Sequence, residues 1–273
     1  ALVWVLLVDG NLSASSAETA PAGSPPAPSA PAAASQPSAP APAKQAASVE
    51  LPASAVRPVL KANDTWTFRA TIENKSGWHQ TREEQTVVRS SDVGILLSTR
   101  EAGSNATPRE LLVGPDWTRV RSVNGKQTVV ARPLVFPMAT GLTWRHEFTE
   151  LSPNREHTKE TWQTVYKVVG PAEVTVPAGT FKAFLIEGDG TWNAELSPAL
   201  ASSAGSRVDA QGSTVVLQTT KIGSQVASGR VYKAYWYVQA VKKYVKSVEE
   251  FYGSNGTRNE RFTWELESYK VAN

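Results

Sequence analysis

Short stretches of alternating apolar and polar residues recur from Thr65 to near the end of the chain, and no stretch has a sustained helical period. Successive side chains of a strand point to opposite faces, so this alternation is typical of strands with one buried face. Thr65–Ile72 alternates apolar residues with threonine and arginine, and Arg261–Val271 begins with an alternation of large apolar residues with threonine and glutamate. A chain patterned in this way is predicted to be all-β.

Turn signals separate the remaining apolar stretches, and one of them predicts a hairpin directly. Asn124-Gly125 lies between Trp117–Val123 and Gln127–Ala131. Asn-Gly favours the type I′ turn, because both central residues of that turn have positive φ. Short strands joined by turns predict antiparallel sheets that form an open barrel or a sandwich. Further strands are expected at Thr81–Ser90, Val93–Arg100, Leu142–Phe148, Thr161–Val169, Val215–Ile222, Val231–Val238 and Tyr244–Phe251.

The expected centre of the core is Pro171–Glu187, where Val174–Val176 and Phe181–Ile186 flank a Pro-Ala-Gly break. Proline cannot donate to a ladder and glycine tolerates positive φ, so the break predicts a tight corner between two strands. The second strand carries apolar side chains on both faces, as a strand covered on two sides does. Glu187-Gly188-Asp189-Gly190 has two carboxylates, but calcium takes about 6–8 oxygen ligands, so the segment is interpreted as a turn. Ala194–Gly212 is interpreted as a mobile loop, with one short helix around Pro198–Ser203 as the alternative.

Residues 1–17 have the features of a truncated signal peptide. Ala1–Val8 is an uninterrupted apolar run, and Ser13–Ala17 offers small residues for cleavage near Ala14 or Ala17. We therefore expect an exported protein that is periplasmic or secreted. The alternative is an uncleaved membrane anchor, which needs about 20 apolar residues and so depends on what precedes Ala1.

Residues 18–56 are rich in alanine, proline and serine and contain no aromatic residue. Such a segment cannot bury enough apolar area to offset the entropy lost on ordering, and repeated prolines favour an extended chain. We therefore expect 18–56 to be a disordered linker. Residues 57–273 then form a single all-β domain, long enough to be held together by its own core.

Composition and spacing exclude several classes of function. The chain has 28 basic and 25 acidic residues, an excess too small to predict nucleic-acid binding, and it has no cysteine for a disulfide, a thiol nucleophile or an acylated lipoprotein terminus. His79, His146 and His157 lack metal-site spacing, and Glu83-Glu84 and Glu249-Glu250 are interpreted as surface charges. No catalytic residue, metal or cofactor is predicted. A hydrolase would require His146 or His157 beside a serine and a carboxylate.

The aromatic segment Tyr232–Tyr237 alternates in a way that gives each face of a strand aromatic rings. Tyr232, Ala234 and Trp236 share one face, and Lys233, Tyr235 and Tyr237 share the other. An uncovered face of this kind, with a lysine nearby, suits a sugar ring, a peptide strand or an acyl chain with an anionic head. The simpler alternative is that neighbouring segments cover both faces. Lys242, Lys243 and Lys246 follow, and we interpret them as solubilising charges that discourage edge pairing, with contacts to lipid phosphate as the alternative.

Four segments in a fixed order resemble a pattern found in uncharacterised exported β-rich proteins of proteobacteria. They are FPMATGLTW at Phe136–Trp144, VVGPAEVTVPAGTFKAFLIE at Val168–Glu187, AYWYVQAVKKYVKS at Ala234–Ser247 and WELESYK at Trp264–Lys270. Gln239 stands where that pattern usually has proline. The resemblance implies an antiparallel sheet in the cell envelope, similar to the open half-barrels that carry lipoproteins or lipids. It implies no catalytic residue.

Two functional hypotheses from different classes follow. The first is a non-catalytic domain that binds an apolar or amphipathic ligand, such as a lipid or acyl chain, within an open barrel. The second is a structural or protein-interaction module of the cell envelope, with a filled core and an exposed edge strand that pairs with a protein partner. Membrane contact is expected to be peripheral, unless the N-terminal segment remains as an anchor. The candidate ligand-binding residues of the first hypothesis are Trp66, Phe68, Trp144, Phe184 and Trp236.

Overall fold

The structure is a computed structural model that describes residues 51–197, 202–208, 214–220 and 226–272. The predicted signal peptide and most of the predicted linker lie outside these residues. The end of the segment assigned to the linker contains a short strand, in which Ala55 is fully buried. Within the described ranges, no helix is long and apolar enough to cross a membrane.

The described residues form an all-β fold, as the alternation predicts, with one 3₁₀ turn at Gln239–Val241. Most predicted strands are confirmed within a few residues. Arg109–Val113 was not predicted, because four of its five residues are exposed and it has no apolar alternation. The strands are β1 Ser54–Ala55, β2 Thr65–Asn74, β3 Gly77–Ser90, β4 Ile95–Glu101, β5 Arg109–Val113, β6 Arg119–Val123, β7 Lys126–Ala131, β8 Met138–Ala139, β9 Thr143–Leu151, β10 His157–Val176, β11 Gly179–Leu196, β12 Ser202–Val208, β13 Thr214–Thr220, β14 Val226–Val238, β15 Lys243–Tyr252 and β16 Arg258–Lys270.

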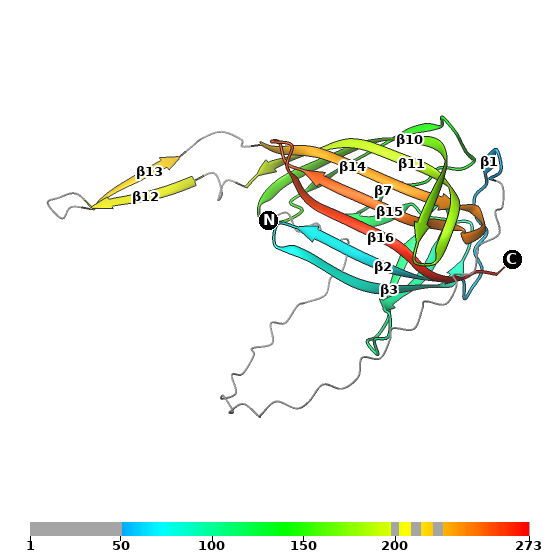
Figure 1. The fold of residues 1–273 in the computed structure, drawn as a ribbon. Helices are drawn as coiled ribbons and strands as arrows, with labels where there is room; N and C mark the ends of the chain where they lie inside the picture. The colour runs from blue at the N-terminus through cyan, green and yellow to red at the C-terminus, as the bar shows by residue number, and fades with distance from the viewer. Residues whose placement is uncertain (1–50, 198–201, 209–213, 221–225, 273) are drawn as a thin grey trace, which may run out of the picture. The chain divides into compact units, whose positions relative to one another are not determined.

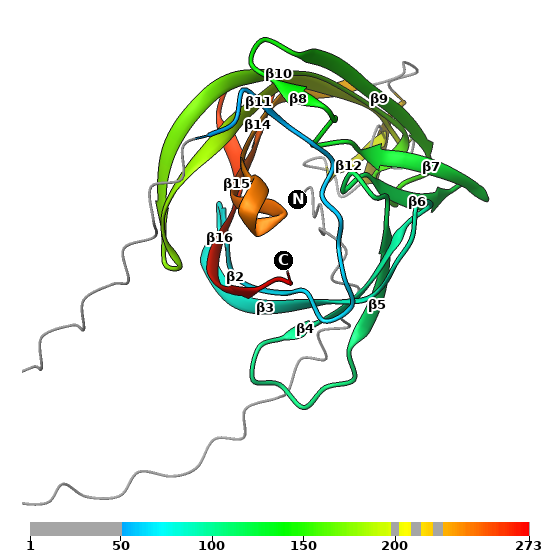
Figure 2. The same ribbon diagram turned by 90° about the vertical axis from the view of Figure 1, so that its right-hand side faces the viewer.

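Twelve strands form one antiparallel sheet in the order β7-β6-β5-β4-β3-β2-β16-β15-β14-β11-β10-β9. The sheet curls into a nearly closed barrel, which Figure 1 shows from the side and Figure 2 along its axis. This confirms the open barrel and not the sandwich. The two end strands of the sheet, β7 and β9, come beside each other, and no ladder joins them.

The strands of the central hairpin, β10 and β11, are longer than predicted. Their corner lies at Pro177-Ala178, as expected, and Gly179 has a φ of 129°. The turn expected at Glu187–Gly190 is wrong, since these residues lie inside β11 and pair with both β10 and β14. The mobile loop expected at Ala194–Gly212 is also wrong in part, because Ser202–Val208 forms β12 and pairs with β13 in a separate hairpin.

The core lies inside the barrel, against the inward face of the sheet. Phe184 and Ile186 are almost fully buried there, which agrees with their expected place at the centre of the core. The register places them beside Tyr237 and Tyr235 of β14. One contiguous cluster of apolar side chains therefore joins the central hairpin to the strands around it.

Several charged side chains expected at the surface lie inside this core. Lys243 is only 2% exposed, because β15 begins directly after the 3₁₀ turn and is a central strand, not an edge. Glu249 faces inward and accepts hydrogen bonds from Lys233 Nζ at 3.0 Å and Tyr235 Oη at 2.7 Å. The surface assignments of Lys243 and Glu249 are therefore wrong. Charges that discourage pairing are needed on an edge strand, whereas β15 pairs with β14 on one side and β16 on the other.

Candidate functional site

The facing edges of β7 and β9 form a seam that side chains close in place of a backbone ladder. The Asn124 amide clamps the Leu151 backbone, donating to its oxygen at 2.9 Å and accepting from its nitrogen at 3.0 Å. Further along, Trp144 Nε1 donates to the Arg132 oxygen at 2.9 Å. The seam is thus an antiparallel junction without the ladder that would complete the barrel.

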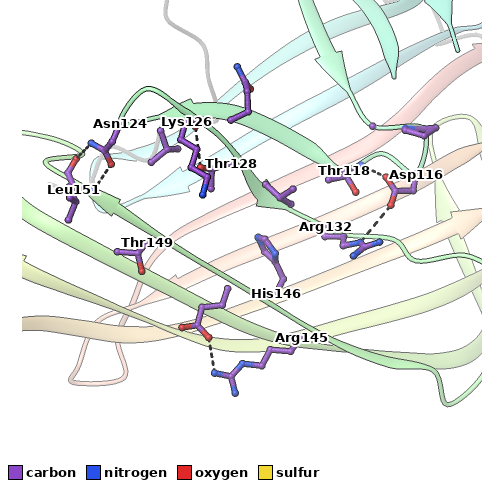
Figure 3. A pocket seen from close by; sticks show the side chains of 16 residues that line it. Asp116, Thr118, Asn124, Lys126, Thr128, Arg132, Arg145, His146, Thr149 and Leu151 are labelled. Atoms are coloured by element: carbon purple, nitrogen blue, oxygen red, sulfur yellow. Dashed lines mark hydrogen bonds and ion pairs between the residues drawn. The ribbon is translucent and has the colours of Figure 1, made fainter. Parts of the chain in front are cut away.

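A cleft of about 1020 Å³ opens along this seam (Figure 3). We call it the seam cleft, and its walls come from β7, β9 and the loop before β6. Val123, Val129 and Leu151 contribute apolar surface, and Thr118 and His146 contribute polar atoms. A smaller cavity of about 510 Å³ shares Pro115, Asp116 and Arg132 with it and extends toward Phe136. The two recesses therefore share part of one wall, and apolar and polar groups line both.

The arginines of the seam cleft are already matched by carboxylates. Arg145 Nη2 lies 2.8 Å from Glu147 Oε2, and this hydrogen bond lowers the pKa of Glu147. Arg132 Nε lies 3.7 Å from Asp116 Oδ2. Ion pairs as exposed as these contribute little to stability. Because each arginine is paired with a carboxylate, the two arginines add little net charge to the cleft.

Two buried polar atoms on the walls of the seam cleft have no hydrogen-bond partner among the described residues. They are Thr118 Oγ1 and His146 Nε2. Burial is the main cause that lowers the pKa of His146, and nearby Lys233 and Arg132 lower it further. The imidazole is therefore neutral at pH 7. Since buried polar atoms are normally paired, these two atoms mark unused hydrogen-bonding capacity.

The five predicted ligand-binding residues lie in three different places. Trp66, Phe68 and Phe184 are buried inside the barrel, and Trp66 Nε1 donates to the Val241 oxygen at 3.0 Å. Trp144 lies at the seam, next to the seam cleft. Trp236 alternates with Tyr235 and Tyr237 in β14 and pairs with Lys246, so it faces the opposite side of the sheet. The structure therefore does not gather the five into one site.

The seam cleft was missed because its walls carry no distinctive sequence pattern. Threonine, valine and arginine in short strands are ordinary β-strand residues, and which strands end the sheet depends on strand order. His146 had been assigned to an ordinary core position beside Trp144 and Phe148. The only usable signal was Asn124-Gly125, which located the hairpin that forms one wall.

The other histidines show no metal site. Within the described ranges, no three histidine, aspartate or glutamate residues come together in an arrangement that would hold a metal ion. His157 Nδ1 lies 2.6 Å from Glu160 Oε1, and Asn154 and Trp162 also bond to that carboxylate. The serine needed for a hydrolase triad is not among the hydrogen-bond partners of His146 or His157 in these ranges.

Replacing Asn124 by glycine is expected to loosen the seam while keeping the turn, because glycine readily adopts the φ of 50° found there. The exposed clamp on Leu151 would be lost, at a cost of about 1 kcal/mol of unfolding free energy. Amide hydrogen exchange at Leu151 should then become faster. Asn124→Asp is the matched control, since it keeps the acceptor for the Leu151 N–H and should exchange at an intermediate rate. Unchanged exchange in Asn124→Gly would contradict a clamping role.

No protein-family model matches the chain, and no curated protein matches it in sequence. Similarities to solved structures are distant. A candidate lipoprotein from Parabacteroides distasonis ATCC 8503 is 11% identical with a TM-score of 0.42, over 79% of this chain and 99% of that one. A candidate exported protein with a YmcC-like fold from Bacteroides fragilis NCTC 9343 is 13% identical with a TM-score of 0.35, over 79% and 99%. The hypothetical lipoprotein YmcC from Escherichia coli K12 is 9% identical with a TM-score of 0.33, over 76% and 85%.

Proposed function

We propose that this protein is an exported, non-catalytic binding domain that takes an amphipathic ligand, such as a lipid or acyl chain, into the seam cleft. The observation that carries the proposal is the cleft itself, about 1020 Å³ along an unclosed seam with apolar and polar walls. Ligand pockets typically occupy about 300–1,000 Å³ and combine apolar surface with a few polar groups. The mixed lining fits a molecule that has both an apolar chain and a polar head.

The seam favours a ligand of this kind over an inserted peptide strand. Each strand of the twelve-stranded sheet is antiparallel to its neighbours, so β7 and β9 at the two ends are antiparallel to each other. A single strand inserted between them would have to run parallel to one of the two. Parallel pairing is slightly less stable and would break the pattern of the whole sheet. A ligand that needs no ladder meets no such restriction.

Export is proposed from the sequence. The apolar run at Ala1–Val8 followed by small residues has the pattern of a signal peptide, and the absence of cysteine removes any need for disulfide formation.

Filling of the barrel interior supports placing the ligand at the seam and not at the centre, because Trp66, Phe68 and Phe184 are at most 1% exposed. Ligand access therefore depends on the seam.

The test is to purify the full chain from a bacterial periplasm and examine it by native mass spectrometry with lipid extraction. Bound amphiphile is expected in the parent protein, and Val129→Trp, which fills the seam cleft, should lose most of it. Val165→Trp is the matched control, because Val165 is exposed on β10 and does not line the cleft. A ligand-free mass for the parent protein, together with no binding of added amphiphiles, would overturn the proposal.

The second candidate is an interaction module of the cell envelope. The nearly complete burial of the barrel interior favours it. The same experiment separates the two, since an interaction module would carry no amphiphile. Val129→Trp and the parent protein would then give the same mass spectrum apart from the substitution.

A further inference from the structure

We propose that the smaller cavity beside the seam cleft is a site for an anionic group attached to an apolar body, and that Arg57 and Arg132 bind the anion. A carboxylate and a phosphate both have this chemistry, either as the head of an amphiphile or on a small organic acid. The inference goes beyond the function proposed above, because Arg57 lines this cavity and not the seam cleft.

One wall of the cavity comes from residues 51–64, which we call the strap. The strap runs across one end of the barrel between β8 and β2 (Figure 2). Ala55 in the strap pairs with β8 and is fully buried, and Pro58 and Leu60 are buried further along. Arg57 lies between these anchors, and the proline that follows it restricts its backbone to extended conformations. The strap is therefore held on both sides of the residue that supplies a guanidinium to the cavity.

The cavity of about 510 Å³ under the strap, which we call the strap cavity, combines apolar walls with charged side chains. Arg132 directly follows β7, and its backbone oxygen is held by Trp144 Nε1 at 2.9 Å. The Phe136 ring packs edge-on against Tyr237 of the core, with 5.3 Å between the ring centroids. A volume of this size is within the range of small-molecule sites, about 300–1,000 Å³. The apolar lining residues are Val56, Pro115, Phe136 and Pro137.

The two guanidinium groups of the strap cavity have unused hydrogen-bond donors. Arg132 Nε lies 3.7 Å from Asp116 Oδ2, and Arg57 Nη2 lies 3.8 Å from Asp92 Oδ1. Both distances are too long for a hydrogen bond, whereas Arg69 donates to a carboxylate at 2.7 Å. Within the part of the chain that the structure describes, neither guanidinium in the cavity donates a hydrogen bond. A guanidinium presents five N–H donors in a planar fork that matches a carboxylate or a phosphate.

The charge of the strap cavity favours an anion. Its described lining residues include two arginines and one carboxylate, that of Asp116, so one positive charge is left over. Asp92 offsets little of it, because the Asp92 side chain is fully exposed and such pairs are weak. The side chains of Arg57 and Arg132 are 52% and 50% exposed. An anion from solvent can therefore reach both groups without disturbing the core.

The test is isothermal titration calorimetry of the full chain with five probes at pH 7.5 and low salt, with the amphiphiles kept below their micelle-forming concentrations. Laurate and dodecyl phosphate carry the anion as an amphiphile head, benzoate and phenyl phosphate carry it on a small body, and dodecyl glucoside is neutral. Anionic probes are expected to bind, and more weakly as salt is raised. Tighter binding of the dodecyl pair identifies an amphiphile head as the source of the anion, and tighter binding of the other pair identifies a small organic anion.

Three variants test the named groups. Arg57→Gln/Arg132→Gln should weaken the anionic probes about tenfold or more and leave dodecyl glucoside unchanged. Asp116→Asn should instead strengthen them about threefold, because it removes the resident charge while its side-chain oxygen still accepts from the Thr118 N–H, at 3.2 Å in the parent protein. Arg89→Gln is the matched control, since Arg89 is exposed on β3 and lines neither recess. It should change anion binding by less than about twofold.

The outcomes separate this inference from the proposed function. Weaker anion binding in the double variant, together with tighter binding in Asp116→Asn, supports the anion site. Failure of every anionic probe to bind, or anion binding that neither variant changes, overturns it. Dodecyl glucoside reports on the seam cleft independently, because its binding should be lost in Val129→Trp and kept in Arg57→Gln/Arg132→Gln.

Discussion

The double variant Gln85→Leu/Lys243→Met is expected to be more stable than the parent protein at pH 6, and this advantage should shrink by about 2–3 kcal/mol between pH 6 and pH 9. Lys243 is the cause. Its ammonium is buried inside the barrel, where its hydrogen-bond partner is the side-chain oxygen of Gln85. Replacing a buried charged group and its partner by apolar residues of similar size is often stabilising.

Aromatic rings surround the Lys243 ammonium and offset part of the free-energy cost of burying its charge. Nζ lies 4.1 Å from the centroid of Trp117, 5.1 Å from that of Phe68 and 5.2 Å from that of Trp66. Ring faces attract cations, more strongly when water is excluded. Burial nevertheless lowers the pKa of Lys243 from 10.5 to about 7, while the Glu83 carboxylate raises it. We give burial the greater weight, because the hydrogen-bond partner of the ammonium is a neutral amide.

The direction of the pH effect follows from proton binding. Lys243 has a pKa near 10.5 in the unfolded chain and about 7 in the folded protein. Between these values the unfolded chain binds more protons, so raising the pH through this window increases the stability of the parent protein. Below pH 7 both states are protonated and the full cost of burying the charge is present. The double variant lacks this dependence.

Urea unfolding of both proteins at pH 6 and pH 9 measures the effect, and comparing the two cancels the titration of all other groups. Gln85→Leu alone provides the opposing control. It leaves the ammonium buried without its partner and should lose about 2–3 kcal/mol at pH 6. A gap between parent and double variant that stays constant with pH would contradict the assignment of the buried charge to Lys243.

Strand positions could be predicted from the sequence because they depend on local alternation and turn chemistry. Thr65–Ile72 and Arg261–Val271 have clean period-two patterns, and Asn124-Gly125 forms the expected turn, with φ values of 50° and 77°. Face assignments within a strand were equally accessible. Tyr235 and Tyr237 share a buried face, and Trp236 faces the other way, as alternation predicts.

Strand order could not be predicted, and the candidate site depends on it. β7 and β9 become neighbours only because the sheet curls until its two ends meet. The aromatic residues chosen as ligand contacts were selected by residue type, and large aromatic side chains serve mostly as core volume. Whether any of them contacts a ligand stays a prediction. Thr118 and His146 became candidates only through the geometry of the seam.

Gly190→Ala is expected to destabilise the protein by about 3 kcal/mol, which is the clearest test of why Gly188-Asp189-Gly190 is not a turn. Glycine serves both at turns and where backbones approach closely, and sequence alone does not separate these uses. In β11, a methyl group on Gly190 would collide with the Gln163 carbonyl oxygen and would lie 2.9 Å from Thr164 Cα. Both are backbone atoms of β10, so the strands themselves would have to move apart.

Gly253→Ala is the matched control for Gly190→Ala. The added methyl group would meet side-chain atoms of Asn255 and Asn259 at 3.2 and 3.3 Å, and these side chains can move aside. Its cost should stay within about 1 kcal/mol. If urea unfolding gave the same loss for both variants, the close approach of β10 and β11 would not be what requires glycine at 190. If only Gly190→Ala lost stability, the close packing of β10 against β11 would explain why residue 190 is a glycine.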